Sequence, residues 1–302
     1  MNPDLDESNT PWHILIAGLP RVSNELTLAS GITLQPLNQP LSVFDLAAAG
    51  AAGFRSWALL EPLASACTCE LAIAPTAAPS AGYNTLNRGW LASSLLVLRG
   101  FTKHLSLACS SYSWNQIAGH QQRTAGTADG NLPKFVGNVL DFHLNIVVNS
   151  DARVDSISPD DIQWISDRFD TFNKMAANSD SFRFALESSI DWRFTKDGRS
   201  AIARLWSGIE AIFGISSELV YRISLLAASL LAPRGTQRRE KFQEIKKLYG
   251  LRSKAVHGSK LSDAKMAEAV NGSFRLLADL LILAIERGHP LTQDDFDKAV
   301  FD

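Results

Sequence analysis

The sequence has few cysteines and no long hydrophobic run, and these absences narrow what the protein can be. Three cysteines in 302 residues are too few for a disulfide framework and fit a reducing compartment. Cys67 and Cys69 lack a second pair at zinc-site spacing, so we expect two half-buried thiols and no metal site. The longest apolar runs, at 224–233 and 276–285, are too short to cross a bilayer.

The start of the sequence argues against a secretory signal. The first seven residues are polar and acidic, whereas a signal peptide begins with positive charge and continues with an apolar stretch. The composition, 46% hydrophobic and 20% charged, is ordinary for a globular protein. We therefore expect a cytoplasmic protein without a membrane partner, long enough for two modest domains.

Positive charge is concentrated in one part of the chain, although the net charge is only −2. Residues 183–260 carry 15 basic and 7 acidic side chains, whereas residues 1–182 carry 10 and 16, and residues 261–302 carry 4 and 8. A local surplus of positive charge suits contact with a phosphate backbone. Solvated helix faces would give the same pattern, so charge alone does not decide between the two interpretations.

The hydrophobic pattern predicts an α+β protein that changes character near residues 150–157. Short, partly alternating segments at 12–18, 31–37, 69–74 and 142–148 are typical of strands, and 83–98 has helical spacing. A polar, glycine-containing loop is expected at 119–133. We therefore predict a mixed α/β domain at 1–152.

From residue 157 onward the apolar spacing becomes helical. Ser158 followed by Pro159 is typical of a helix start, and Gly288 with Pro290 marks the end of a last long helix from about 262. Between them, helices are expected at about 179–192, 197–214, 216–232 and 236–249. The second domain, at 157–302, is therefore predicted to be an all-α bundle.

The most informative segment runs from Tyr249 to Gly258, where Arg252 and His257 stand five positions apart. An imidazole titrates near neutral pH and can move protons, and a guanidinium binds phosphate oxygens. The spacing is weak evidence, because Arg99 and His104 share it at the end of an apolar helix without surrounding positive charge. We expect that second pair to be structural.

The geometry of one regular helix would not bring Arg252 and His257 together. Positions i and i+5 lie about 140° apart around the axis. Gly250 has the character of a helix C-cap, and Ser262 can cap the next helix, so a single bent turn is expected between them. The two side chains could converge on that turn, or two copies could meet across a dimer axis. Alternatively, the arginine staples a helix end and the histidine binds a backbone carbonyl.

Three blocks of sequence resemble HEPN domains (higher eukaryotes and prokaryotes nucleotide-binding), especially the ApeA-like group. Leu-Trp-Ser-Gly-Ile-Glu-Ala-Ile-Phe-Gly at 205–214 is similar to the helix that opens the HEPN core. Glu-Leu-Val-Tyr-Arg-Ile-Ser-Leu-Leu-Ala-Ala-Ser-Leu-Leu at 218–231 follows it, and Leu-Tyr-Gly-Leu-Arg-Ser-Lys-Ala-Val-His-Gly at 248–258 is similar to the group's signature. The resemblance covers about 160–288, and the N-terminal half matches no family that we can assign.

The resemblance implies a helical bundle that dimerises so that two Arg-x4-His segments face each other in a basic cleft. Active members of the family are metal-independent endoribonucleases, which implies RNA as partner and no cofactor. Arg252 and His257 match the catalytic positions, with Ser253, Glu210, Tyr249 and Lys254 in supporting positions. The side chains expected to bind RNA are Arg222, Arg238, Arg239, Lys246 and Lys247.

The leading hypothesis is therefore an endoribonuclease that uses the 2′-hydroxyl of RNA as the nucleophile. His257 would act as general base or acid, and Arg252 would stabilise the charge on the phosphate oxygens. Glu210 would hold one of them, or would pair structurally with Arg204 or Arg222. The alternative is a non-catalytic HEPN module for dimerisation and for binding a nucleotide, RNA or protein.

A third hypothesis places the main activity in the N-terminal domain, where no recognised motif supports it. The sequence scatters the candidate side chains Ser110, Ser111, His13, His120 and His143. By analogy alone, we expect this domain to sense an unidentified ligand or regulator, restraining a toxic nuclease in phage defence. The tryptophans at 57, 90, 114, 164, 192 and 206 are expected to be core residues more often than platforms for nucleic-acid bases.

Overall fold

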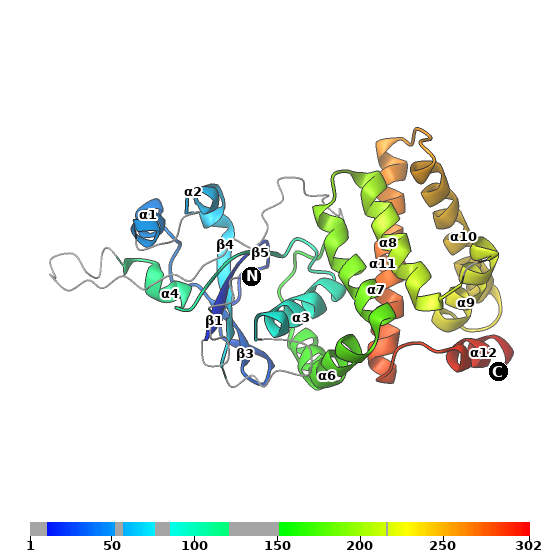
Figure 1. The fold of residues 1–302 in the computed structure, drawn as a ribbon, viewed down its shortest axis with the longest axis horizontal. Helices are drawn as coiled ribbons and strands as arrows, with labels where there is room; N and C mark the ends of the chain where they lie inside the picture. Colours follow the sequence, from blue (N-terminus) through cyan, green and yellow to red (C-terminus); the bar gives the residue numbers. More distant parts are fainter. Residues whose placement is uncertain (1–10, 52–56, 76–84, 121–150, 216) are drawn as a thin grey trace. The chain divides into compact units, whose positions relative to one another are not determined.

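The computed structural model describes residues 11–51, 57–75, 85–120, 151–215 and 217–302 (Figure 1). Contacts divide them into two units. The sheet unit comprises the described residues of 1–142 together with 153–169, and the helical unit comprises those of 143–152 and 170–302. The fold is α+β, as the sequence predicts.

The sheet unit is built on five antiparallel strands in the order β2-β3-β4-β1-β5. The predicted strands at 12–18, 31–37 and 69–74 are confirmed, whereas the one at 142–148 and most of the loop at 119–133 lie outside the described residues. Two strands, β2 and β5, were not predicted. The five strands are β1 Trp12–Ala17, β2 Leu26–Ala29, β3 Ile32–Pro36, β4 Cys67–Ile73 and β5 Leu105–Ser110.

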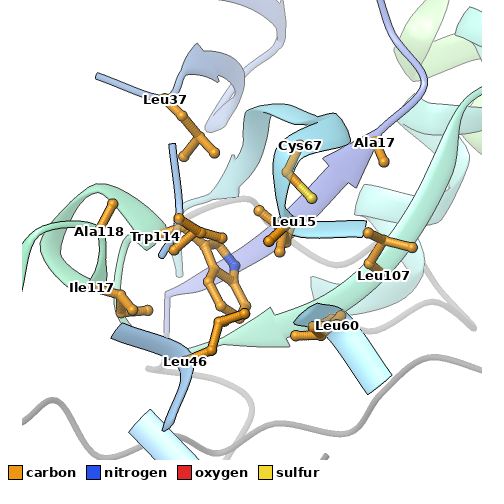
Figure 2. Packing of buried hydrophobic residues seen from close by; sticks show 13 residues of the cluster. Leu15, Ala17, Leu37, Leu46, Leu60, Cys67, Leu107, Trp114, Ile117 and Ala118 are labelled. Atoms are coloured by element: carbon orange, nitrogen blue, oxygen red, sulfur yellow. The ribbon is translucent and has the colours of Figure 1, made fainter. Parts of the chain in front are cut away.

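Helices cover both faces of the sheet. On one face, Leu15 and Trp114 belong to a buried cluster with residues from α1 (Val43–Ala51), α2 (Trp57–Leu60), a 3-10 helix (Glu61–Ala66) and α4 (Trp114–Ile117) (Figure 2). On the other face lies α3 (Thr85–Leu98), the predicted helix. Gly89 lets α3 approach closely, because a Cβ there would lie 2.2 Å from the Ile73 side chain.

The described part of the chain from residue 159 onward is mostly helical, and several of its helices begin or end at capping residues. The side-chain oxygens of Ser179, Asp197 and Ser262 accept hydrogen bonds from the backbone of the helices that follow them. Gly288 ends α11 in the left-handed region, at φ 78°. The helices are α6 Pro159–Asn178, α7 Asp180–Asp191, α8 Gly198–Phe213, α9 Leu219–Leu231, α10 Thr236–Val256, α11 Asp263–Arg287 and α12 Gln293–Phe301, with a 3-10 turn at Trp192–Phe194.

Within the helical unit, α8 packs against α7, α10 and α11, and α9 packs against α10 and α12 (Figure 1). The predicted helix at 236–249 is too short. Gly250 does not end it, since α10 continues to Val256 with Gly250 in its interior. The short helix α12 was not predicted.

The tryptophans are largely core residues, as expected. Trp114, Trp192 and Trp206 are fully buried, and Trp90 and Trp164 are partly buried. The side chain of Trp57 lies outside the described part of the structure. Over the residues that the structure covers, no helix combines the length and apolar character needed to cross a membrane.

Candidate functional site

The end of α10 fixes the backbone position of His257. The N–H of Ser259 donates to the carbonyl of Lys254 at 2.9 Å, and the N–H of Gly258 donates to the carbonyl of Ala255 at 3.3 Å. This pair of bonds is a Schellman motif, which needs a left-handed residue after the cap. Gly258 supplies it at φ 82°, so this glycine has a structural reason.

The side chain of Arg252 is held between two neighbours. Its Nη2 donates to Glu210 Oε1 at 3.2 Å, which joins α10 to α8. Its guanidinium lies 5.3 Å from the centroid of the Tyr249 ring. The buried Nε has no hydrogen-bond partner among the described residues. Part of the guanidinium therefore contacts Glu210 and Tyr249 within the protein, and the side chain remains 23% exposed.

Tyr249 is fixed in turn by the core of the bundle. Its ring packs edge-on against Trp206, with centroids 5.0 Å apart and planes at 81°. The indole N–H of Trp206 donates to the hydroxyl of Ser273 at 2.9 Å. Residues of α8, α10 and α11 therefore hold the surface on which Arg252 lies.

His257 is exposed, and its ring has no polar partner among the residues that the structure describes. The expected bent turn between Arg252 and His257 is wrong, because α10 is continuous as far as Val256. On a continuous helix the two positions point about 140° apart. Within one copy they do not converge on one phosphate.

The supporting and basic side chains fall into two groups. Arg222, Arg239, Lys246 and Lys254 are exposed, and Ser253 is partly buried, with its carbonyl accepting the backbone N–H of His257. The remaining two have protein partners: Lys247 pairs with Glu268, and Arg238 donates to the carbonyls of Ala232 and Ala299 at 3.1 and 3.0 Å.

The second Arg/His pair lies in the sheet unit and has structural partners. Arg99 Nε donates to Asp161 at 2.8 Å, and its guanidinium lies 5.3 Å from the Trp164 ring. His104 is 3% exposed. Arg99 is bound by a buried carboxylate and His104 is buried, which fits the structural role expected for this pair.

A polar cluster in the sheet unit was missed in the sequence, because only strand register brings its members together. His13 Nδ1 lies 3.3 Å from Glu70 Oε1, and the register places His13 opposite Ser110. Glu70 is fully buried and accepts hydrogen bonds from Ser113 Oγ at 2.6 Å and from the Trp114 backbone N–H at 2.5 Å. Its carboxylate holds the start of α4, which is a structural role. His143 lies outside the described residues.

No protein-family model, curated protein or solved structure matches this chain. In the described ranges, no group of three or more His, Cys, Asp or Glu side chains is arranged to hold a metal ion. The resemblance to HEPN domains therefore stays a prediction, and a function has to be argued from the residues themselves.

Proposed function

We propose that the helical unit is a metal-independent endoribonuclease of the HEPN type that acts as a homodimer. One observation carries the proposal. α10 presents a guanidinium held by Glu210 and Tyr249, and it ends at the exposed imidazole of His257, which has no polar partner among the described residues. Further exposed cations, Lys246 and Lys254, lie on the same helix.

The chemistry follows from what these groups can do. The 2′-oxygen of the RNA attacks the adjacent phosphorus, a base takes its proton, and the bond from phosphorus to the 5′-oxygen breaks. An acid protonates the leaving oxygen, which gives a 2′,3′-cyclic phosphate and a 5′-hydroxyl. His257 supplies the base and acid, one from each copy, and general acid–base catalysis of this kind is worth about 10² to 10⁴-fold.

Arg252 would stabilise the negative charge that builds on the non-bridging oxygens. Glu210 would position the guanidinium, since it touches Arg252 and not the substrate. Because Arg252 and His257 diverge along one helix, the site requires a second copy, as a twofold axis would supply.

The test is digestion of RNA by the wild type, Arg252→Ala and His257→Ala, with and without EDTA. Two control variants are matched to these. Arg204→Ala removes an arginine with the same kind of surroundings, an ion pair to Asp191 at 3.0 Å and the Phe184 ring at 4.8 Å. His289→Ala removes another exposed histidine of the helical unit.

We expect the wild type to form cyclic-phosphate products with and without EDTA. Arg252→Ala and His257→Ala should not form these products, whereas both control variants should. DNA of the same sequence should stay intact, because it lacks the nucleophile. Cleavage that stops with chelator, or that survives both substitutions, would overturn the proposal.

A second candidate function is a non-catalytic binding module, and the ion pair of Arg252 with Glu210 favours it, since a paired guanidinium has less charge to offer. In that case bulk RNA stays uncut, and His257→Ala leaves both ligand affinity and assembly unchanged. Under both candidate functions, the sheet unit would serve as the sensing or regulatory part of the protein.

A further inference from the structure

An open hollow of about 460 Å³ lies beside the candidate site, between the first turn of α9 and α10. Its lining residues are Glu218, Leu219, Val220, Tyr221 and Tyr249. The volume is within the range of small-molecule sites. The lining combines aliphatic side chains, two phenol rings and one carboxylate, a combination suited to a flat aromatic ligand with polar edges.

Both tyrosines pack against other rings. Tyr221 is 60% exposed, and its ring packs against Phe242 at 5.8 Å between centroids and 73° between planes. Tyr249 packs against the buried Trp206. Rings supported in this way lose little freedom when a planar ligand stacks on them, and stacking on aromatic side chains is the usual way in which unpaired bases are bound.

Glu218 is the charged residue in the lining of the hollow. It is exposed, its side chain caps no backbone N–H of α9, and no partner of its carboxylate is found among the described residues. It is also, in the described chain, the one residue other than glycine with a positive φ, 52°. Residues in such conformations cluster at functional sites, so the Glu218 side chain is a candidate for ligand binding.

The geometry points to a subsite for a guanine base in RNA, a proposal that rests on the function proposed above. A carboxylate only accepts hydrogen bonds. Guanine presents two adjacent donors, N1–H and the 2-amino group, whereas adenine, cytosine and uracil each present one donor group on that edge. Beside a polyanion a carboxylate is unfavourable unless base donors reach it, so Glu218 would favour guanine over the other bases.

The location of the hollow connects base recognition to the cleaved linkage. The Tyr249 ring is a wall of the hollow, and the Arg252 guanidinium lies 5.3 Å from the centroid of the same ring. A guanine in the hollow would therefore be next to the cation proposed to bind the scissile phosphate. We expect cleavage beside guanosine.

Binding is tested first with RNA that cannot be cut. Three labelled hexamers, 2′-O-methylated throughout and otherwise oligo-A, carry guanosine, inosine or adenosine at the centre, and affinity is measured by fluorescence anisotropy. Inosine lacks only the 2-amino group. We expect the wild type to bind the guanosine hexamer about tenfold more tightly than the inosine or the adenosine hexamer. A difference of this size is within the range that one bidentate contact contributes.

Variants of the hollow separate recognition from general affinity. Glu218→Gln should remove the preference for guanosine, while Glu240→Gln, which removes an exposed carboxylate on α10, should keep it. Tyr221→Ala should weaken the binding of all three hexamers about equally. Tyr221→Phe should leave their binding unchanged, because stacking needs the ring alone. Equal binding of the three hexamers by the wild type, or a preference that survives Glu218→Gln, overturns the subsite.

Cleavage of unmodified hexamers distinguishes this inference from the function on which it rests. Guanosine-selective binding without any cleavage would support the subsite and rule out the nuclease function. Cleavage with no difference between guanosine and inosine substrates keeps the nuclease and removes the subsite.

Discussion

The guanidinium of Arg252 on α10 and the carboxylate of Glu210 on α8 form an ion pair 3.2 Å long. The pair ties the basic helix to the helix at the centre of the bundle, and it fixes where the arginine can act. Both side chains are about three-quarters buried, so the pair is protected from solvent without being dry. Arg252 can therefore exchange its hydrogen bond to Glu210 for a hydrogen bond to a phosphate oxygen.

Glu210→Gln should reduce RNA cleavage about tenfold, because the guanidinium loses its positioning partner. The free energy of unfolding should fall by less than about 1 kcal/mol, since partly exposed ion pairs contribute little. In the double variant with Arg252→Ala, kcat/KM should be no lower than in Arg252→Ala alone. Additive losses in the two variants would show that Glu210 acts independently of Arg252.

Gly250→Ala should raise the free energy of unfolding by roughly 0.5–1 kcal/mol, because glycine inside a helix is unfavourable. Gly250 lies in α10, and nothing is within 4 Å of a Cβ built there. Gly208→Ala is the matched opposite: its Cβ would lie 2.7 Å from the Cβ of Ser188, so α7 and α8 would have to separate. Urea unfolding followed by circular dichroism gives both values, and a loss of stability at Gly250 would contradict the assignment of an open helix face.

Asp161→Asn should destabilise the sheet unit by roughly 2–4 kcal/mol. Burial alone raises the pKa of Asp161, but hydrogen bonds from Arg153, Ser158 and Arg99 outweigh it and hold the pKa well below the usual value. The side chain is 1% exposed, and Arg153 and Arg99 bind it at 2.9 and 2.8 Å.

The pH dependence has a definite sign. A lowered pKa stabilises the folded state fully above the unfolded value of about 3.9, and the contribution is lost as the pH falls below it. The difference between the wild type and Asp161→Asn should therefore be constant near neutral pH and shrink below about pH 4. A difference that does not change between pH 6 and pH 3 would mean that the carboxylate is not the charged partner.

The native thiols of β4 should react slowly with a disulfide reagent at pH 8. Burial raises the pKa of Cys67 to about 12, with the neighbouring Cys69 adding to the shift, and burial likewise raises the pKa of Cys69 to about 12. The thiolate is the reactive form, so little is present at pH 8. Labelling in denaturant at the same pH is the control, where all three cysteines should react at once.

Local sequence signals predicted most of the helices and the central strands. Ser262 and Gly288 bound α11 as expected, because capping depends on residues close in sequence. The strand β2 was missed because it has only four residues, and β5, although as long as β1, has a burial pattern that becomes visible only beside its partner strand. Gly250 was misinterpreted because a glycine marks a helix end only where the backbone turns left-handed, and packing on α8 and α9 keeps α10 straight past it.

The candidate site could likewise be predicted only in part from the sequence. The sequence pattern made Arg252 and His257 candidates, and the family resemblance added Glu210, but the divergence of the first two follows from the length of α10. The hollow could not be found at all, because Glu218 and Tyr249 are distant in sequence and meet only where α9 packs against α10. Strand register likewise hid the contact of His13 with Glu70.

Glu218→Gly should make the protein more stable and less selective at once. At φ 52° a side chain with a Cβ is strained by about 1–2 kcal/mol, and glycine is not. Part of that gain is offset by the greater freedom of glycine in the unfolded chain, which leaves roughly 0.5–1 kcal/mol. Glu218→Ala separates the two effects, because it removes the carboxylate and keeps the strain. Both variants should lose the preference for guanosine over inosine, and only Glu218→Gly should raise the midpoint of urea unfolding. If neither variant changes the preference while the glycine variant is more stable, the left-handed residue has only a structural origin, and the carboxylate has no part in recognising a base.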